Sequence, residues 1–151
     1  MKANYDIIIV GAGPTGIFTA YELMLKCPKK SVLLIDKGHD INDRNCPILN
    51  KKIKQCPKDT EGHSGCKPSC SMTAGFGGSG AYSDGKFNIT NEFGGWMSEY
   101  LDVDEVLDLI KYVDSINLKH GAPKELTDPT TKEVVASHRY ARQPLSVGNV
   151  A

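Results

Sequence analysis

The residues best placed to do chemistry are three closely spaced glycines near the N-terminus, the two residues between the second and third of them, and an aspartate twenty positions further along. They are Gly11, Gly13, Pro14, Thr15, Gly16 and Asp36. Their G-x-G-x-x-G spacing is typical of a strand-to-helix turn that binds the diphosphate of a dinucleotide. Gly11 allows the tight turn, Gly13 lets the backbone approach the diphosphate, and Gly16 lets the helix pack closely on the sheet. Asp36 can accept hydrogen bonds from ribose hydroxyls, and it would repel a 2′-phosphate, which disfavours NADP.

A strand, a helix and a second strand must position these residues. Residues 5–10 are an apolar run too short for a helix, and residues 31–35 are a second such run that ends just before Asp36. Between them, apolar side chains recur every three or four positions after Pro14, which is typical of a helix whose N-terminus offers free N–H groups to a phosphate. We expect both strands to be buried on both faces of a parallel sheet. The sequence therefore predicts an α/β fold of the Rossmann type.

A second glycine-dense segment, residues 74–86, follows further along the chain. Such a loop could extend along a bound dinucleotide and offer backbone N–H groups to its pyrophosphate or to a flavin. The position of the first glycine turn, close to the N-terminus, also favours FAD over NAD. A flexible linker is the alternative, although the interspersed aromatic residues favour packing. Asp84 and Lys86 are interpreted as a turn acid and a solvated lysine, with contact to the flavin as the alternative.

Several segments together resemble a known family: IIIVGAGPTGIFTAYEL, VLLIDKG, the R-N-C-P of residues 44–47, GFGGSGAYSDGKFN and EFGGWMSEYL. Over residues 6–123 they are similar to FAD-dependent dehydrogenases of the glutathione-reductase-like flavoprotein superfamily. Proteins of that family are much longer, so we expect this chain to be an N-terminal fragment. The resemblance implies FAD as the cofactor of a flavin-dependent oxidoreductase.

The same resemblance implies which residues hold the cofactor. The first glycine turn and Asp36 would bind FAD, together with Lys37. A second group would lie near the diphosphate or the isoalloxazine: Gly78, Ser79 and Gly80. Arg44 would be a phosphate partner. No catalytic acid, base or nucleophile is identified, because the substrate-facing half of the family is not expected in this chain.

The five cysteines leave three interpretations open: Cys27, Cys46, Cys56, Cys66 and Cys70. Cys27 falls at the end of the first helix and is expected to be structural. The other four could be thiols on a surface insertion, ligands of zinc or an iron–sulfur cluster with His63 as a further donor, or a redox pair next to the flavin. Two C-x-x-C knuckles are absent, and Cys66 and Cys70 are separated by three residues. The odd number of cysteines and the lack of an export signal argue against a disulfide framework.

We expect five segments along the chain: a dinucleotide-binding βαβ unit (1–45), a cysteine-rich insertion (46–72), the second cofactor loop (73–90), a helical segment (91–123) and an irregular tail (124–151). The insertion shows no sustained periodicity. In the helical segment, apolar residues line one face of a helix that we expect to begin with Asp104 as N-cap and to end at His120. Gly121 and Pro123 would stop it.

Composition limits the partners. The 151 residues include 18 basic and 18 acidic ones, so the formal net charge is zero, which indicates neither nucleic acid nor an anionic membrane surface. No run approaches the roughly 18 consecutive apolar residues of a membrane span. The N-terminus lacks the pattern of a signal or transit peptide, so we expect a cytoplasmic location. The oligomeric state is not indicated.

These patterns predict the FAD-binding part of an oxidoreductase whose flavin exchanges hydride or electrons with NAD(P)H or a small-molecule substrate. Two alternatives remain open at this point. One is a fragment of an NAD-dependent dehydrogenase, in which the second glycine loop would serve the substrate. The other is a non-enzymatic module, built on a metal knuckle or on a truncated binding domain.

Overall fold

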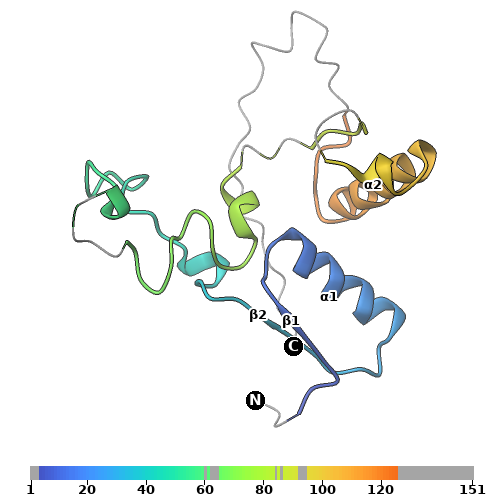
Figure 1. Cartoon of the computed structure of the whole chain (residues 1–151), viewed down its shortest axis with the longest axis horizontal. Helices are drawn as coiled ribbons and strands as arrows, with labels where there is room; N and C mark the ends of the chain where they lie inside the picture. The colour runs from blue at the N-terminus through green and yellow to red at the C-terminus, as the bar shows by residue number, and fades with distance from the viewer. Residues whose placement is uncertain are drawn as a thin grey trace, which may run out of the picture. The chain divides into compact units, whose positions relative to one another are not determined.

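The computed structural model describes residues 4–59, 61, 65–83, 85, 87–91 and 95–125. The chain forms two compact units, residues 1–83 and residues 84–151 (Figure 1). His63, Asp84 and Lys86 lie outside the described residues, as does the predicted tail after Glu125.

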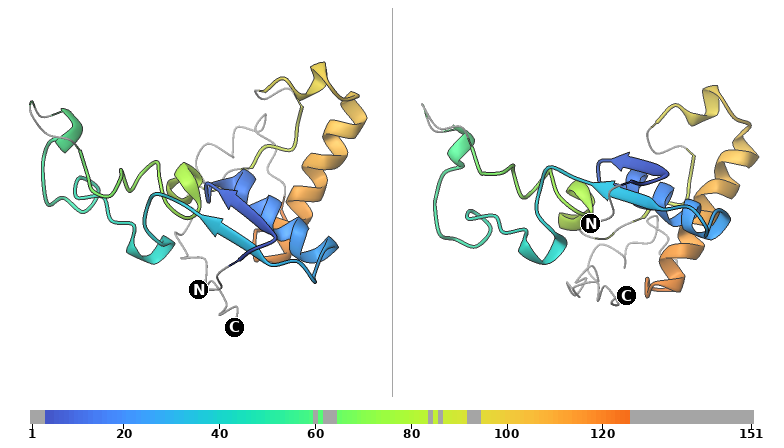
Figure 2. Two further views of the ribbon diagram at one scale, coloured as in Figure 1. Left: turned by 60° about the horizontal axis from the view of Figure 1, so that its bottom comes forward. Right: turned by 90° about the horizontal axis from the view of Figure 1, so that it is seen from below.

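The first unit begins with a strand–helix–strand arrangement. Strand β1 (Ile7–Val10) is followed by helix α1 (Pro14–Lys26) and strand β2 (Val32–Ile35). The two strands are parallel, with Ile7 opposite Val32 and Val10 opposite Ile35. Helix α1 runs alongside this two-stranded sheet, as the views of Figure 2 show, and packs against both strands. The α/β fold with a parallel βαβ unit is confirmed.

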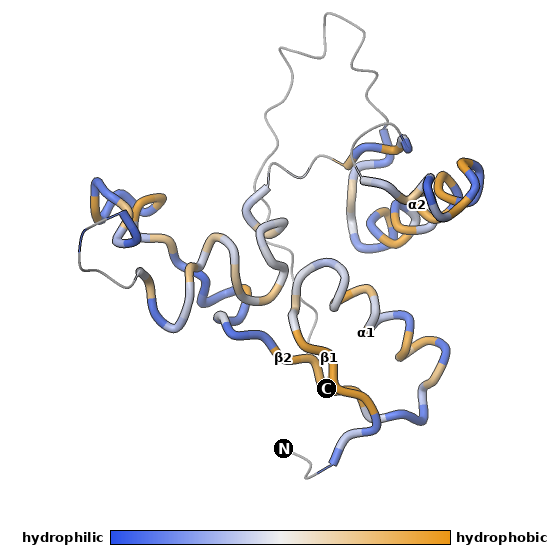
Figure 3. Tube along the Cα trace, viewed as in Figure 1, coloured by the Kyte–Doolittle hydropathy of each residue, from blue (hydrophilic) through white to orange (hydrophobic). Residues whose placement is uncertain are grey.

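One face of this sheet is open. The strands are the most apolar stretch of the unit (Figure 3), yet Ile8 is 58% and Val10 is 80% exposed, and Ile35 is 41% exposed. The residues that alternate with them in β1 are partly buried. The prediction that the strands are buried on both faces is therefore wrong for the described residues, because α1 covers one side of the sheet and the other side faces solvent.

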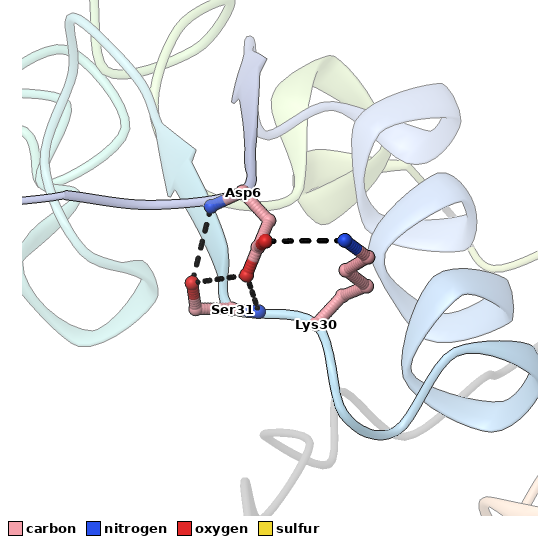
Figure 4. A network of polar contacts seen from close by, with 3 residues as sticks. All are labelled: Asp6, Lys30 and Ser31. Carbon is pink, nitrogen blue, oxygen red and sulfur yellow. Dashed lines mark hydrogen bonds and ion pairs between the residues drawn. The ribbon is translucent and has the colours of Figure 1, made fainter.

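The start of the sheet is closed by a polar network (Figure 4). The carboxylate of Asp6 accepts hydrogen bonds from the backbone N–H and the hydroxyl of Ser31, both at 2.8 Å. It also pairs with the ammonium group of Lys30 at 3.2 Å. The N–H of Asp6 donates in turn to the Ser31 carbonyl oxygen at 3.0 Å. These contacts lower the pKa of Asp6 from its ordinary 3.8 to about 2, the backbone hydrogen bond from Ser31 having the largest effect.

The remainder of the first unit is irregular. Its described residues beyond β2 contain only short 3-10 turns, namely η1 (Ile41–Asp43), η2 (Pro57–Asp59) and η3 (Gly78–Tyr82). The absence of periodicity in the cysteine-rich stretch agrees with this. The glycine-rich segment nevertheless returns to the end of β2, where the N–H of Phe76 donates to the carbonyl oxygen of His39 at 3.1 Å.

The second unit contains η4 (Met97–Glu99) and helix α2 (Val103–Lys119). The predicted N-cap, Asp104, is wrong: the N-cap is Asp102, whose carbonyl oxygen accepts the N–H of Val106 at 3.0 Å. Gly121 has a φ of 98°, in agreement with its expected role in ending the helix. Among the described residues, neither helix combines the length and apolar character that crossing a bilayer requires.

Candidate dinucleotide site

The turn between β1 and α1 needs glycine at two positions. Gly11 has a φ of 104°, in the left-handed region that other residues disfavour, and its N–H donates to the Ile35 carbonyl oxygen at 2.7 Å. A Cβ on Gly16 would overlap the carbonyl oxygen of Gly11. Only glycine at position 16 therefore allows the helix to start this close to the strand. These contacts agree with the turn and packing roles expected of the two glycines.

The N-terminus of α1 is open to a ligand. Gly13 precedes the helix, and its carbonyl oxygen accepts the N–H of Ile17 at 3.0 Å. The N–H groups of Thr15 and Gly16 therefore come before the helical ladder, and Pro14 has none. Apart from its neighbours in the chain, no atom of the described residues would lie within 4 Å of a Cβ on Gly13. The first turn also carries no acidic side chain, so the positive end of the helix dipole is unopposed there.

The Asp36 side chain, at the carboxyl end of β2, joins three separate pieces of backbone. Its Oδ2 accepts the N–H of Ala12 in the first glycine turn at 2.8 Å. Its Oδ1 accepts the N–H groups of Gly38 and Gly75, each at 2.8 Å. The hydrogen bonds from Ala12 and Gly38 lower the pKa of this carboxyl most, and the bond from Gly75 and the charge of Lys37 act in the same direction. Asp36 is therefore ionised at neutral pH.

The two glycine-rich loops lie against each other. The N–H of Gly77 donates to the carbonyl oxygen of Ala12 at 2.8 Å. A Cβ on Gly78 would lie 3.2 Å from the Cα of Gly13 and 3.4 Å from the Cδ of Pro14. Gly78 has a φ of 57°, so this close approach and the backbone conformation both favour glycine. The loop from the far end of the first unit thus meets the N-terminus of α1.

Arg44 holds this second loop from inside the protein. The residue is buried, with 6% of its surface exposed. Its Nε and Nη2 donate to the carbonyl oxygen of Ser71 at 2.9 and 2.7 Å. Its Nη1 donates to the carbonyl oxygens of Phe76 and Gly78 at 2.8 and 2.6 Å. The guanidinium also lies 5.0 Å from the ring centre of Tyr82, within range of a cation–π contact. Most of its donors therefore serve the backbone, and its contact with a phosphate stays a prediction.

The remaining residues predicted to bind the cofactor are all exposed: Pro14, Thr15, Lys37, Ser79 and Gly80. Gly80 lies beside Pro14, because a Cβ on it would be 3.9 Å from the Pro14 Cγ. The structure thus brings residues of the two loops and Asp36 to one place, while Arg44 supports that place from beneath.

Sequence reasoning missed the crossing of two backbone segments next to Asp36. A Cβ on Gly38 would overlap the backbone of Gly75, which has a φ of 109°. The close approach lets both N–H groups reach the same carboxylate oxygen. One local signal was available: the D-x-G of residues 36–38 is the pattern in which an aspartate accepts the N–H two residues on. The partner 39 positions away had no such signal.

The cysteines fall into two places. Cys27 is exposed and follows the last residue of α1. The other four line one cavity of about 230 Å³: Cys46, Cys56, Cys66 and Cys70. All five are thiols rather than disulfides. In the part of the chain that the structure describes, no group of three or more histidine, cysteine, aspartate or glutamate side chains is placed so that it could hold a metal ion.

Comparison with known proteins gives one short similarity. A segment of 41 residues is 42% identical to the FAD-containing monooxygenase EthA of Mycolicibacterium smegmatis (strain ATCC 700084 / mc(2)155). The segment covers 27% of this chain but only 8% of the monooxygenase. No family model matches the chain, and no solved structure matches it. The similarity weakly supports the general class of flavoprotein oxidoreductases. It does not indicate a particular family or substrate within that class.

Proposed function

We propose that this chain binds FAD as part of a flavin-dependent oxidoreductase. The observation that carries the proposal is the meeting of the two glycine-rich loops at the open N-terminus of α1, where Gly77 bonds to Ala12 and Asp36 bonds to both loops. N–H groups that precede the helical hydrogen-bond ladder, the positive end of a helix dipole and room beside Gly13 are what a diphosphate requires. The short similarity to an FAD-containing monooxygenase favours FAD among the dinucleotides.

In this proposal each part of the site has its own task. Gly13, Thr15 and Gly16 bind the diphosphate through the backbone at the start of α1. The second loop, through Gly78, Ser79 and Gly80, extends the surface along the cofactor. When bound, FAD would supply the redox chemistry, with NAD(P)H or a small molecule as the exchange partner.

Asp36 can serve the ribose while it holds the loops. Among the described residues, its Oδ2 accepts one hydrogen bond, from Ala12, and a carboxylate oxygen can accept two. An adenosine ribose hydroxyl could therefore bind Oδ2 without displacing the backbone. The negative charge of the same group would oppose a 2′-phosphate, so we expect the site to reject NADP.

The test is FAD binding by the full chain and by Gly13→Val. The wild-type protein is titrated with FAD, and binding is followed by the change in flavin fluorescence and by the flavin that remains after dialysis. The valine side chain would occupy the space beside the helix N-terminus, so FAD binding should be lost while the far-UV circular dichroism is retained. Thr19→Val is the matched control, because residue 19 is exposed on α1, six positions further along the chain.

Two results would contradict the proposal. One is FAD binding by Gly13→Val that equals the wild type. The other is a wild-type chain that is folded and binds NAD but not FAD, which would favour an NAD-dependent dehydrogenase.

A further inference from the structure

The cysteine-rich insertion, residues 46–72, brings thiols from three places along the chain to one cavity. Cys46 precedes a turn, Cys56 precedes η2, and Cys66 and Cys70 flank a short bend. All four line the same cavity of about 230 Å³, whose other walls include Pro47, Ile48 and Met72. The described residues of this insertion contain no α-helix and no strand.

The four thiols share one cavity but differ in exposure. Cys46, Cys56 and Cys66 are partly buried, and Cys70 is exposed.

The described residues of the insertion have neither an α-helix nor a strand to order them. Where a small segment buries little apolar surface, a disulfide or a metal often supplies the stability that a core would otherwise give. The cysteines here are thiols, and Cys27 lies elsewhere, directly after α1. Four thiols that line one cavity offer the donor set of a closed, tetrahedral structural zinc site.

We propose that Cys46, Cys56, Cys66 and Cys70 bind one Zn²⁺ ion as four thiolates and that this ion organises the insertion. The thiols line the cavity rather than surrounding a metal position, so binding draws them inward and releases their protons, as is usual when metal binding is coupled to folding. The three residues between Cys66 and Cys70 fit the C-x₂₋₄-C spacing of zinc sites. A C-x₃-C spacing also occurs among iron–sulfur ligands, so elemental analysis is needed to distinguish the two metals.

The charge of the insertion suits this site. Residues 46–72 contain five lysines and two acidic residues, a net charge of +3 with histidine neutral. A Zn²⁺ ion with four thiolates carries a formal charge of minus two. The lysines therefore offset the charge that zinc binding leaves in the insertion.

The site also has a structural connection to the second glycine loop. Ser71 follows Cys70 directly, and its carbonyl oxygen accepts two hydrogen bonds from Arg44. Arg44 in turn donates to the carbonyl oxygen of Gly78. A metal that orders Cys70 therefore orders the backbone on which Arg44 rests. The zinc assignment does not depend on the proposed FAD site, because the two are measured separately.

The experiment uses the full chain, purified under reducing conditions without chelator. Elemental analysis should find about one zinc per chain. Replacement of the zinc by Co²⁺ should produce the strong visible absorption of a tetrahedral site and a sulfur-to-cobalt charge-transfer band. Cys56→Ser and Cys70→Ser should each lose the metal, whereas Cys27→Ser, the matched control, should keep it.

A second measurement covers the case in which the serine variants do not fold. Wild-type protein is stripped of metal with a chelator and exposed to trypsin, which cleaves after lysine, with and without added Zn²⁺. Zinc should slow cleavage at Lys51, Lys52, Lys54 and Lys58 and leave cleavage after Lys29 unchanged. Absence of metal and of any zinc protection would overturn the proposal, as would iron with acid-labile sulfide in place of zinc. FAD content is determined on the same samples, so a failed zinc site is distinguishable from a failed FAD site.

Discussion

The carboxylate of Asp36 accepts a hydrogen bond at 2.8 Å from the backbone N–H of Gly75, which lies 39 positions further along the chain. Its other oxygen accepts the N–H of Ala12 in the first glycine turn. One side chain therefore holds together two loops that local sequence patterns describe separately. The residue expected to bind a ribose is also the residue that assembles the proposed site.

Replacing this carboxylate tests the assembling role. In Asp36→Asn one acceptor oxygen becomes an NH₂ group, which would face backbone N–H donors. Because buried donors would lose their acceptor, we expect a loss of about 1–3 kcal/mol in the free energy of unfolding. Urea unfolding measures this loss. Asp40→Asn is the control, because Asp40 is exposed and its carboxylate bonds only to nearby Asn42 among the described residues. Equal stability of the two variants would contradict the assembling role.

Gly16 should be essential for folding rather than for cofactor contact alone. A Cβ at this position would overlap the Gly11 carbonyl oxygen, and backbone atoms cannot move aside cheaply. We expect Gly16→Ala to destabilise the first unit by about 1–3 kcal/mol or more. Gly13→Ala, three residues earlier, has open space for its methyl group and should stay folded. Thermal unfolding followed by circular dichroism separates the two variants. Similar melting of both would show that the close packing at Gly16 is not required.

Arg44 gives a test that distinguishes support from direct contact with the cofactor. Lysine carries one compact ammonium group and cannot reach the three carbonyl oxygens that the guanidinium binds. We therefore expect Arg44→Lys to lower the free energy of unfolding by about 1.5–3 kcal/mol in the absence of any ligand. The measurement is urea unfolding of the ligand-free protein, with the exposed Lys29→Gln as control. Unchanged stability combined with weaker FAD binding would instead favour a direct phosphate contact.

The polar network at Asp6 predicts a dependence of stability on acid pH. The pKa of this carboxyl falls from 3.8 to about 2 on folding, so the folded state favours the ionised form. Its contribution to stability is complete above pH 3.8 and is lost as the pH falls towards 2. We expect Asp6→Asn to flatten the decline of stability over this interval, as measured by urea unfolding at several pH values. Asp43→Asn, exposed in the same unit, should keep the wild-type slope; a wild-type slope in Asp6→Asn would contradict the prediction.

Local patterns were sufficient where neighbours in sequence are neighbours in space. The βαβ unit, the start of α1 at Pro14 and the end of α2 before Gly121 all followed from periodicity, proline and glycine within a few residues. The N-cap of α2 was misplaced by two positions, since Asp102 and Asp104 are both acceptable cap residues. Burial of the strands was overestimated, because an apolar sequence shows what could be buried but not what covers it.

The sequence alone determined which residues form the glycine turn and the N-terminus of α1. These residues are consecutive in the chain, so their geometry is local. Only the tertiary structure decided that Asp36 bonds to Gly75 and that Arg44 is buried beneath the second loop. It also decided that four cysteines share one cavity. These contacts join residues separated by up to 39 positions through a segment without periodicity, and no short-range pattern specifies where such a segment returns.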